Sequence, residues 1–194
     1  MVETRRQQIE DAASALFRER GYSATSVRDI AQALNLQGGS LYAHVASKED
    51  VLWSIVERAA DRFDAAVGPI AESGIPAPAR LRAMVRAHVG VITGDLGNAA
   101  SFLHEWRFLS PERRAAMNAR RDRYERRFRR VIHEGVTAGD FAPLDPRMTS
   151  MAVLSALNGI ATWYRPAGDR RADDIAADYA DLFLRSLRRT SSDD

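Results

Sequence analysis

The sequence contains no cysteine, which excludes disulfides, cysteine metal sites and a thiol nucleophile. No apolar run approaches the roughly 18 residues that a membrane-spanning helix requires, and the opening MVETRR is unlike the start of a secretory signal. We therefore expect a cytoplasmic protein without a membrane segment. The 194 residues allow one domain or two small ones, and 45% hydrophobic with 28% charged residues is ordinary for a globular chain.

Catalytic and metal-binding patterns are equally scarce. The four histidines are scattered along the chain, and His104-Glu105 lacks the second histidine of a zinc-protease motif. There is no G-x-S-x-G elbow, and the glycines at 38–39 lack the lysine that follows in a P-loop. We expect no catalytic residue, no metal and no cofactor. A small helical enzyme is the least favoured alternative.

Lysine is nearly absent, because 27 of the 28 basic residues are arginine and Lys48 is the only lysine. The formal net charge is +2, yet nine arginines and only two acids fall between residues 113 and 130. Residues 1–50 instead hold six basic and seven acidic residues. A search for nucleic-acid contacts guided by bulk charge would therefore begin in the wrong half of the chain.

Helical patterns cover almost the whole sequence, and we find no convincing strand or repeat. Gly21 is placed to end the first helix, and Asn35 tolerates the left-handed backbone that ends the second. Gly68-Pro69 and residues 73–78 predict loops. The fold is predicted to be all-α, with about nine helices. Their expected ranges are 3–20, 27–34, a short helix ending near Val45, 48–67, 79–93, 99–109, 111–138, 145–163 and 172–188.

Residues 24–50 predict a helix-turn-helix. Ser26, with Asp29 three positions later, forms a capping-box pattern, although Thr25 could serve as the cap instead. In this motif the second helix lies in the major groove, and its first residues meet bases and phosphates. Gly38 and Gly39 have no Cβ atom, so the backbone of QGGSLYAHV can approach DNA closely. The same glycines could also form a mere turn, since paired short helices occur in many all-α proteins.

Side chains around this turn have the chemistry that DNA contacts need. An amide can bond a base edge, a hydroxyl a base or a phosphate, and the lysine that starts the next helix can bond a phosphate. The predicted DNA-binding residues are Thr25, Ser26, Arg28, Gln37, Gly38, Gly39, Ser40, Tyr42, His44 and Lys48.

The stretch GYSATSVRDIAQALNLQGGSLYAHVASKEDVL, residues 21–52, resembles the DNA-binding region of the TetR family of bacterial transcriptional regulators. The likeness implies a homodimeric repressor, with a DNA-binding domain at 1–47 and a ligand-binding and dimerisation domain at 48–194, joined by helix 48–67. It also implies two kinds of contact. Groove reading falls to Gln37, Gly38, Gly39, Ser40 and Tyr42, and phosphate contacts to Thr25, Ser26, His44 and Lys48.

Four positions depart from the family's pattern. Gln37 stands where a serine cap is common, and Val45 replaces the family's phenylalanine. Asn35 stands where a glycine is usual, and Gly38 stands where lysine or another polar residue is common. Because position 38 lacks a basic side chain, we expect fewer phosphate contacts and a shallower salt dependence of DNA binding.

The C-terminal half carries apolar stripes beside an arginine-rich helix. The stripes either form the core or line an apolar ligand pocket. The arginines at 120, 123, 127 and 130 share one helical face, which is either solvated or binds the phosphates of an amphipathic anion. The predicted ligand-binding residues are Phe102, Trp106, Met117, Arg120, Arg123, Tyr124, Arg127, Phe128, Met151 and Trp163.

Four further segments are similar to TetR-family regulators of fatty-acid, sterol-derived or phenylacetate degradation. They are EWRFLSP at 105–111, RRDRYE at 120–125, EGVTAGDF at 134–141 and WYRP at 163–166. The similarity implies an acyl-CoA thioester as the inducer that releases the repressor from a palindromic operator. A drug-like amphiphile sensed by a regulator of efflux is the alternative, and an activator or an inducer-independent repressor also remains open.

The last two long helices carry small residues, which allow close helix approach. The family resemblance implies that they form a four-helix interface with the second subunit. Packing within one subunit is the competing explanation for any single position. The predicted dimerisation residues are Leu154, Leu157, Ile175, Tyr179, Leu182 and Phe183.

Overall fold

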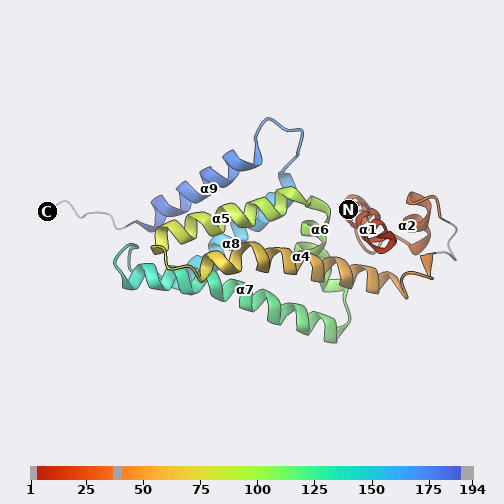
Figure 1. The fold of residues 1–194 in the computed structure, drawn as a ribbon, viewed down its shortest axis with the longest axis horizontal. Helices are drawn as coiled ribbons and strands as arrows, with labels where there is room; N and C mark the ends of the chain where they lie inside the picture. Colours follow the sequence, from red (N-terminus) through yellow and green to blue (C-terminus); the bar gives the residue numbers. More distant parts are fainter. Residues whose placement is uncertain (1–3, 37–40, 189–194) are drawn as a thin grey trace. The chain divides into compact units, whose positions relative to one another are not determined.

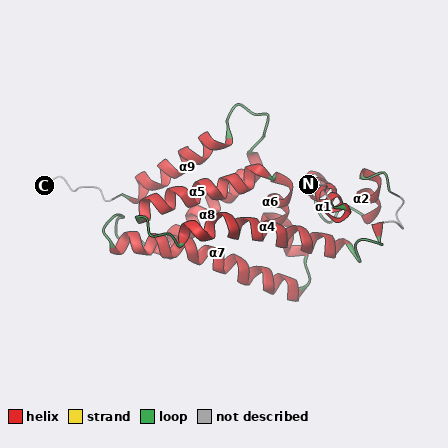
Figure 2. Ribbon diagram, in the orientation of Figure 1, coloured by secondary structure: helices red, strands yellow, loops and turns green. Residues whose placement is uncertain are grey.

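The computed structural model describes residues 4–36 and 41–188, and within these ranges it contains helices and no strand (Figure 1, Figure 2). The all-α prediction is thereby confirmed, with eight α-helices in the described ranges against the nine expected in the whole chain. None of these helices is both long and apolar enough to cross a bilayer. The helices are α1 Arg5–Arg20, α2 Val27–Ala33, α4 Lys48–Ala71, α5 Ala77–Gly94, α6 Leu96–Ala100, α7 Pro111–Thr137, α8 Pro146–Trp163 and α9 Ala172–Leu187.

Local backbone geometry confirms how the first two helices end. Gly21 has φ of 84° and its N–H bonds the carbonyl of Phe17, so it closes α1. Asn35 has φ of 53°, which is the left-handed backbone expected for the turn after α2. Both residues fix the direction in which the chain leaves a helix.

The predicted loop at Gly68-Pro69 is wrong, because α4 continues through Pro69 to Ala71. A proline inside a helix removes one backbone hydrogen bond and crowds the preceding turn. Here Val67 and Ala71, four residues apart, are both fully buried on the same side of the helix. Burial of this apolar side outweighs the local cost, so the helix ends one turn later than the sequence pattern predicts.

The expected regular helix over 99–109 is also wrong. Helix α6 ends at Ala100, a π-helical turn covers Ser101–Glu105, and a 3₁₀ turn covers Trp106–Phe108. Ser101, Phe102 and Leu103 are all buried. A regular α-helix turns 100° per residue and would spread three consecutive side chains around its axis, so a half-exposed amphipathic helix does not fit this segment. Single π turns are rare and frequently mark functional sites.

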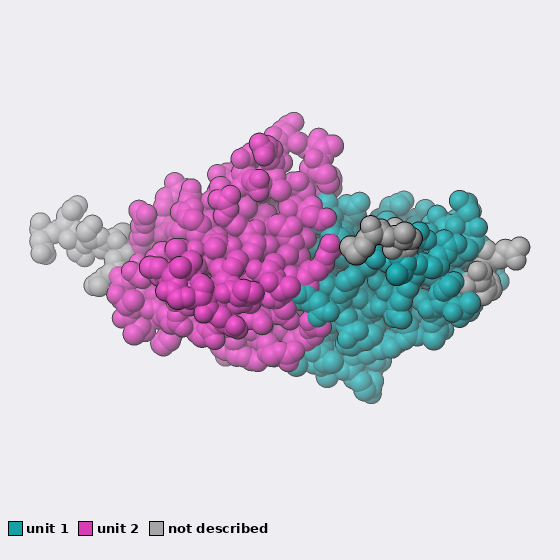
Figure 3. Space-filling view, viewed as in Figure 1, with its two compact units in different colours: residues 1–61, 95–119 teal, residues 62–94, 120–194 magenta. Residues whose placement is uncertain are grey.

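The chain packs as two compact units, which Figure 3 colours separately. Unit 1 comprises Met1–Asp61 and Asp95–Ala119, and there α1 packs against α2, α6 and the π turn. Its core contains Ile9, Phe17 and Ile30. The N-terminal helices thus share a core with residues 95–119, which follow α5 in the sequence. A single cut in the sequence would therefore not separate the two units.

Unit 2 comprises Arg62–Gly94 and Arg120–Asp194, and there α5 packs against both α8 and α9. Its core includes Leu157 and Ile175, whose side chains are 0% and 1% exposed. Two of the six predicted dimerisation residues are therefore internal residues of one subunit. The sequence could not separate the two roles, because an apolar stripe looks the same in a core and in an interface.

A histidine lies inside unit 2. His88 on α5 packs against the rings of Phe63 and Phe128, and its Nδ1 lies 2.9 Å from the hydroxyl of Tyr124. Burial lowers the pKa of His88 to about 3, although Asn158 offsets part of this effect. Among the described atoms, Nε2 has no partner at hydrogen-bonding geometry. His88 is thus a neutral imidazole in an aromatic core.

This burial predicts a pH dependence of stability. The folded pKa of His88, about 3, lies below its ordinary value of 6.5, so the unfolded chain binds more protons between these limits. Lowering the pH through this range therefore favours unfolding, by about 1.4 kcal/mol for each pH unit. We expect His88→Gln to show a flatter decline of unfolding free energy than wild type between pH 6.5 and pH 4.5, measured by urea denaturation. The exposed His44→Gln is the matched control, and parallel profiles for His88→Gln and wild type would contradict the prediction.

Candidate functional site

The start of α2 is fixed by a reciprocal pair of hydrogen bonds. The N–H of Asp29 donates to the Ser26 hydroxyl at 3.2 Å, and the N–H of Ser26 donates to the Asp29 carboxylate at 2.7 Å. The hydrogen bond from the Ser26 side chain lowers the pKa of Asp29, so the carboxylate remains charged. The predicted capping box is confirmed, with Ser26 rather than Thr25 as the cap.

Thr25 faces the interior. Thr25 is only 1% exposed, and its hydroxyl donates a hydrogen bond to the carbonyl of Gly21 at 2.9 Å. A buried hydroxyl with a satisfied hydrogen bond is not available to a phosphate. The structure therefore argues against the predicted phosphate contact by this side chain.

The only lysine of the chain closes the connection between α1 and α2 onto the start of α4. The Lys48 ammonium donates to the carbonyl of Tyr22 at 2.9 Å and to the carbonyl of Thr25 at 2.8 Å. It also lies 4.1 Å from the centre of the Tyr22 ring. Partial burial lowers the pKa of Lys48. We call this arrangement the Lys48 clamp; it uses two of the three N–H donors of the ammonium group.

Tyr22, which the sequence analysis did not single out, lies at the centre of these contacts. Its ring stacks on Phe108 at 5.4 Å and meets the edge of Phe17 at 5.1 Å. Its N–H donates to the carboxylate of Glu105 at 3.3 Å, at the end of the π turn. Burial, followed by the charge of Glu49, raises the pKa of the Tyr22 hydroxyl. The glycine followed by an aromatic residue at 21–22 is the sequence feature from which this role could have been predicted.

The first turn of α4 is tied to the first turn of α7. Arg113 bonds Glu49 at 3.1 Å and Asp50 at 2.5 Å, and the N–H of Ser110 donates to Glu49 at 3.0 Å. The Ser110 backbone bond lowers the pKa of Glu49, and the Arg113 bond lowers the pKa of Asp50. The two acids in the first turn of α4, where the helix dipole favours them, thus also bind a cation. Arg113 is accordingly a structural residue.

One side of the segment after the turn is exposed within the described residues. Leu41 and Val45 are buried, whereas Tyr42 is 57% exposed and His44 and Arg28 are also exposed. Residues 41 and 45 therefore attach this segment to the core, while the residues between them face outward. The predicted contacts Gln37, Gly38, Gly39 and Ser40 lie outside the described residues.

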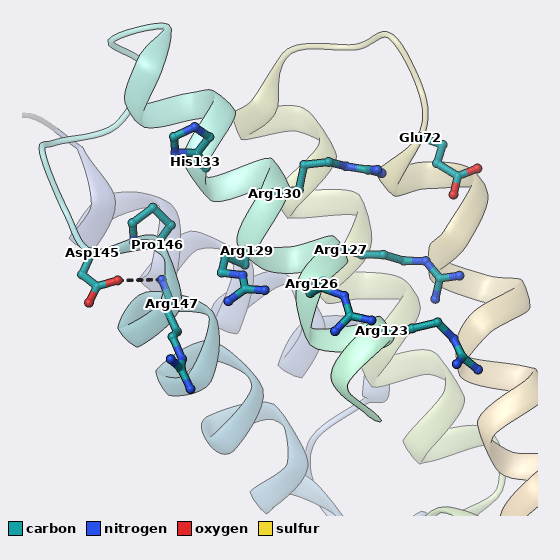
Figure 4. Close-up of a pocket in the computed structure, with 10 residues that line it drawn as sticks. All are labelled: Glu72, Arg123, Arg126, Arg127, Arg129, Arg130, His133, Asp145, Pro146 and Arg147. Carbon is teal, nitrogen blue, oxygen red and sulfur yellow. Dashed lines mark hydrogen bonds between the residues drawn. The ribbon is translucent and has the colours of Figure 1, made fainter. Parts of the chain in front are cut away.

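Unit 2 has a cavity of about 710 Å³ between α7, the end of α4 and the start of α8 (Figure 4). We call it the arginine cavity. Two acids also border it, of which Asp145 caps α8 by accepting from the N–H of Arg147 at 2.8 Å. The lining residues are Glu72, Arg123, Arg126, Arg127, Arg129, Arg130, His133, Asp145, Pro146 and Arg147.

The arginines of the cavity differ in how their charge is balanced. Arg127 bonds Asp64, and Arg130 donates to the carbonyl of Ala71 at 3.3 Å. Across residues 4–36 and 41–188, no carboxylate forms an ion pair with the side chain of Arg123, Arg126 or Arg147. The cavity therefore carries positive charge that the described part of the protein does not neutralise.

The predicted ligand residues do not gather at one place. Arg123 and Arg127 line the arginine cavity, together with arginines 126, 129, 130 and 147, which the sequence analysis missed as ligand residues. Arg120 instead bonds Asp64 at 3.2 Å. The remaining predictions divide among other environments: Phe102, Trp106 and Met117 belong to unit 1, Tyr124 and Phe128 surround His88, and Met151 and Trp163 are 49% and 45% exposed.

No group of three or more histidine, aspartate or glutamate side chains is arranged to hold a metal ion in the part of the chain that the structure describes.

Large apolar side chains are exposed on the last two helices. Met148 and Leu182 are 63% and 55% exposed, on α8 and α9. Exposed apolar side chains mark an interaction surface where they gather into one contiguous patch.

Known protein families match both the N-terminal and the C-terminal part of the chain. Residues 9–55 match the family of bacterial regulatory proteins named tetR, and residues 74–187, more than half of the chain, match the tetracyclin repressor-like C-terminal domain. The HTH-type transcriptional repressor KstR2 of Rhodococcus jostii is 30% identical over 185 residues, covering 94% of this chain and 91% of that protein.

Solved structures give the same result. The structure of the ketosteroid transcriptional regulator KstR2 of Mycobacterium tuberculosis has a TM-score of 0.92 at 28% identity and covers 98% of each chain. AibR, crystallised in complex with isovaleryl coenzyme A and operator DNA, has a TM-score of 0.83 at 28% identity and covers 95% of this chain and 98% of its own. This chain therefore belongs to the TetR family of bacterial regulatory proteins.

Proposed function

We propose that this protein is a homodimeric transcriptional repressor that binds a palindromic operator and is released from it by an acyl-CoA thioester. The observation that carries the DNA-binding part is the outward side of residues 41–46, next to a capped α2 and the Lys48 clamp. A DNA-binding repressor works where the chromosome is, so we place it in the cytoplasm. An enzymatic function has no support, because the relatives are regulators.

DNA recognition follows from this geometry. The helix-turn-helix places its second helix in the major groove, with its N-terminal end near base edges and phosphates. We assign phosphate contacts to Arg28, Tyr42 and His44, whose side chains are exposed. Residues 37–40, which the sequence predicts to contact DNA, remain part of the proposed DNA-binding site. Lys48 has one N–H left for a phosphate, so its larger contribution is to fix the positions of the helices that carry the contacts.

A palindromic operator requires two copies of this segment, about 34 Å apart on one face of the duplex. We assign the dimer surface to the exposed apolar residues of α8 and α9, with Met148, Met151 and Leu182 at its centre. Leu154, Tyr179 and Phe183 are partly exposed and remain candidates for the same surface. Leu157 and Ile175 are withdrawn from it, because they are buried within one subunit.

The effector class is supported by the similarity to AibR, which binds isovaleryl coenzyme A and operator DNA in one crystal. The match covers nearly the whole of both chains, so it includes the ligand-binding part. The cationic lining of the arginine cavity in unit 2 fits an anionic effector better than the cationic drug of the alternative hypothesis.

Loss of the Tyr42 side chain should weaken operator binding without affecting the fold. A lost hydrogen bond to phosphate costs about 1 kcal/mol, and the dimer loses two, so Tyr42→Ala should raise the Kd roughly 30-fold. Fluorescence anisotropy with a duplex from the protein's own upstream region measures this. Tyr42→Phe keeps the ring and tests the hydroxyl alone. Wild-type affinity in Tyr42→Ala would remove Tyr42 from the interface.

Lys48→Met should reveal a structural role. The substitution keeps the apolar stem but leaves the carbonyls of Tyr22 and Thr25 without their donor, so the unfolding free energy should fall by about 2 kcal/mol. Operator binding should weaken, while the dependence of its logarithm on log salt should stay close to that of wild type.

Arg28→Met is the matched control for Lys48→Met. Arg28 is exposed, so its loss should leave stability unchanged and reduce the salt slope by about 1.8 for two phosphates in the dimer. If Lys48→Met instead kept full stability and lost this much slope, Lys48 would be a phosphate contact and the clamp would be unimportant.

The effector assignment is tested by release from DNA. The purified protein on its upstream duplex is challenged with short, long and aromatic acyl-CoAs, free CoA, free fatty acids and a cationic dye. We expect release by at least one thioester and none by the corresponding free acid. Release by the dye while every acyl-CoA is inert would reject the effector class and favour the drug-sensing alternative.

A further inference from the structure

The lining of the arginine cavity has many more cations than acids. Six arginines and two acids line it, and five of the arginines lie on a short stretch of α7 (Figure 4). Arg123, Arg126 and Arg130 follow one another at spacings of three and four residues, and Arg127 and Arg129 lie between them. Like charges at these spacings repel and destabilise a helix. The repulsion would be relieved by an anion among them.

Helix electrostatics do not explain this row of cations. Positive side chains are favoured in the last turn of a helix, but α7 continues to Thr137, beyond the arginine row. Internal acids do not explain it either. Asp64 already bonds two arginines, Arg120 and Arg127, and two acids of α7 itself, Glu125 and Glu134, reach Arg129 and Arg130 only at 3.8 and 3.9 Å. Asp122, the third acid beside the row, forms no ion pair within the described residues.

The cavity also draws cations from a second helix. Arg147 lies in the first turn of α8, and Figure 4 shows the α7 arginines between it and Glu72. Among the arginines that line the cavity, Arg123, Arg126 and Arg147 are the three whose guanidinium groups form no ion pair with a carboxylate within residues 4–36 and 41–188. Guanidinium groups bind phosphate through two parallel hydrogen bonds, and cations from two helices can contact separate phosphates.

We propose that the arginine cavity binds the phosphates of coenzyme A, its 5′-diphosphate and 3′-phosphate, with Arg123, Arg126 and Arg147 as the principal contacts. This rests on the proposed function, in which the effector is an acyl-CoA thioester. A volume of about 710 Å³ lies in the usual range for a small-molecule site and suffices for the nucleotide end of the ligand. The acyl chain then needs an apolar environment elsewhere, and its recognition is separate from that of the phosphates.

The test compares a cavity variant with a matched helix variant. Arg126→Gln/Arg147→Gln removes two of the unpaired charges from facing helices. Arg114→Gln makes the same change at an exposed arginine of α7 that does not line the cavity. Isothermal titration calorimetry measures binding of the most effective acyl-CoA, its 3′-dephospho form, 3′,5′-ADP and inorganic pyrophosphate to each protein. The last two probes distinguish a nucleotide from a simple phosphate ligand.

We expect the cavity variant to bind the acyl-CoA at least tenfold more weakly than wild type, and to lose most of the preference for the 3′-phosphate. The Arg114→Gln variant should bind every probe as wild type does. Because removal of like charges relieves repulsion, the cavity variant should melt no lower than wild type in the absence of ligand. A lower melting temperature with unchanged acyl-CoA affinity would show the arginines to be structural and would overturn the proposal.

The two levels of the hypothesis can fail separately. If acyl-CoA releases both wild type and the cavity variant from DNA at equal concentration, the proposed function stands and the phosphate assignment is rejected. If no acyl-CoA binds wild type but 3′,5′-ADP or pyrophosphate binds it and not the cavity variant, the cavity is a phosphate site and the proposed effector is wrong. If wild type binds none of these anions, both are rejected.

Discussion

The interaction on which the DNA-binding part depends is the contact of one ammonium group with two backbone carbonyls. Lys48 bonds Tyr22 and Thr25, and the ring of Tyr22 lies beside the ammonium. These bonds join the start of α4 to the connection between α1 and α2, so they hold the beginning of α2 against α4. A charge-assisted hydrogen bond is about twice as strong as a neutral one, and partial burial reduces competition from water. Recognition of DNA requires fixed spacing between contacts, and this contact supplies it.

The arginines of the chain fall into two groups with different physical roles. Arg113 and Arg127 bond carboxylates, and through them they connect α7 to α4, one in each unit. Arg123, Arg126 and Arg147 have no such partner in the described ranges and line a cavity. Sequence position does not separate the groups, since both occur on α7 within a few turns. The distinction depends on whether an acid such as Asp64 lies opposite, and this is a property of packing between helices that are distant in sequence.

Much of the fold was predictable because the signals are local. The capping box at Ser26, the end of α1 at Gly21 and the left-handed Asn35 each follow from a residue and its near neighbours. The errors came where packing overrides local preference. Helix α4 passes through Pro69 because apolar burial continues, and Ser101–Glu105 forms a π turn in which three consecutive side chains, those of Ser101, Phe102 and Leu103, are buried. The role of Tyr22 was missed for the same reason, as its contacts reach residues more than 80 positions away.

The scarcity of lysine gives the Lys48 clamp a practical consequence. Apart from the chain terminus, the protein has a single primary amine, and that amine is engaged by two carbonyls and partly buried. Chemical modification by an amine-directed acylating reagent therefore acts on one side chain alone, and an acylated Lys48 has lost its charge and keeps a single N–H donor. The rate of that single reaction becomes a direct readout of how often the α1–α2 connection separates from α4, without any engineered label.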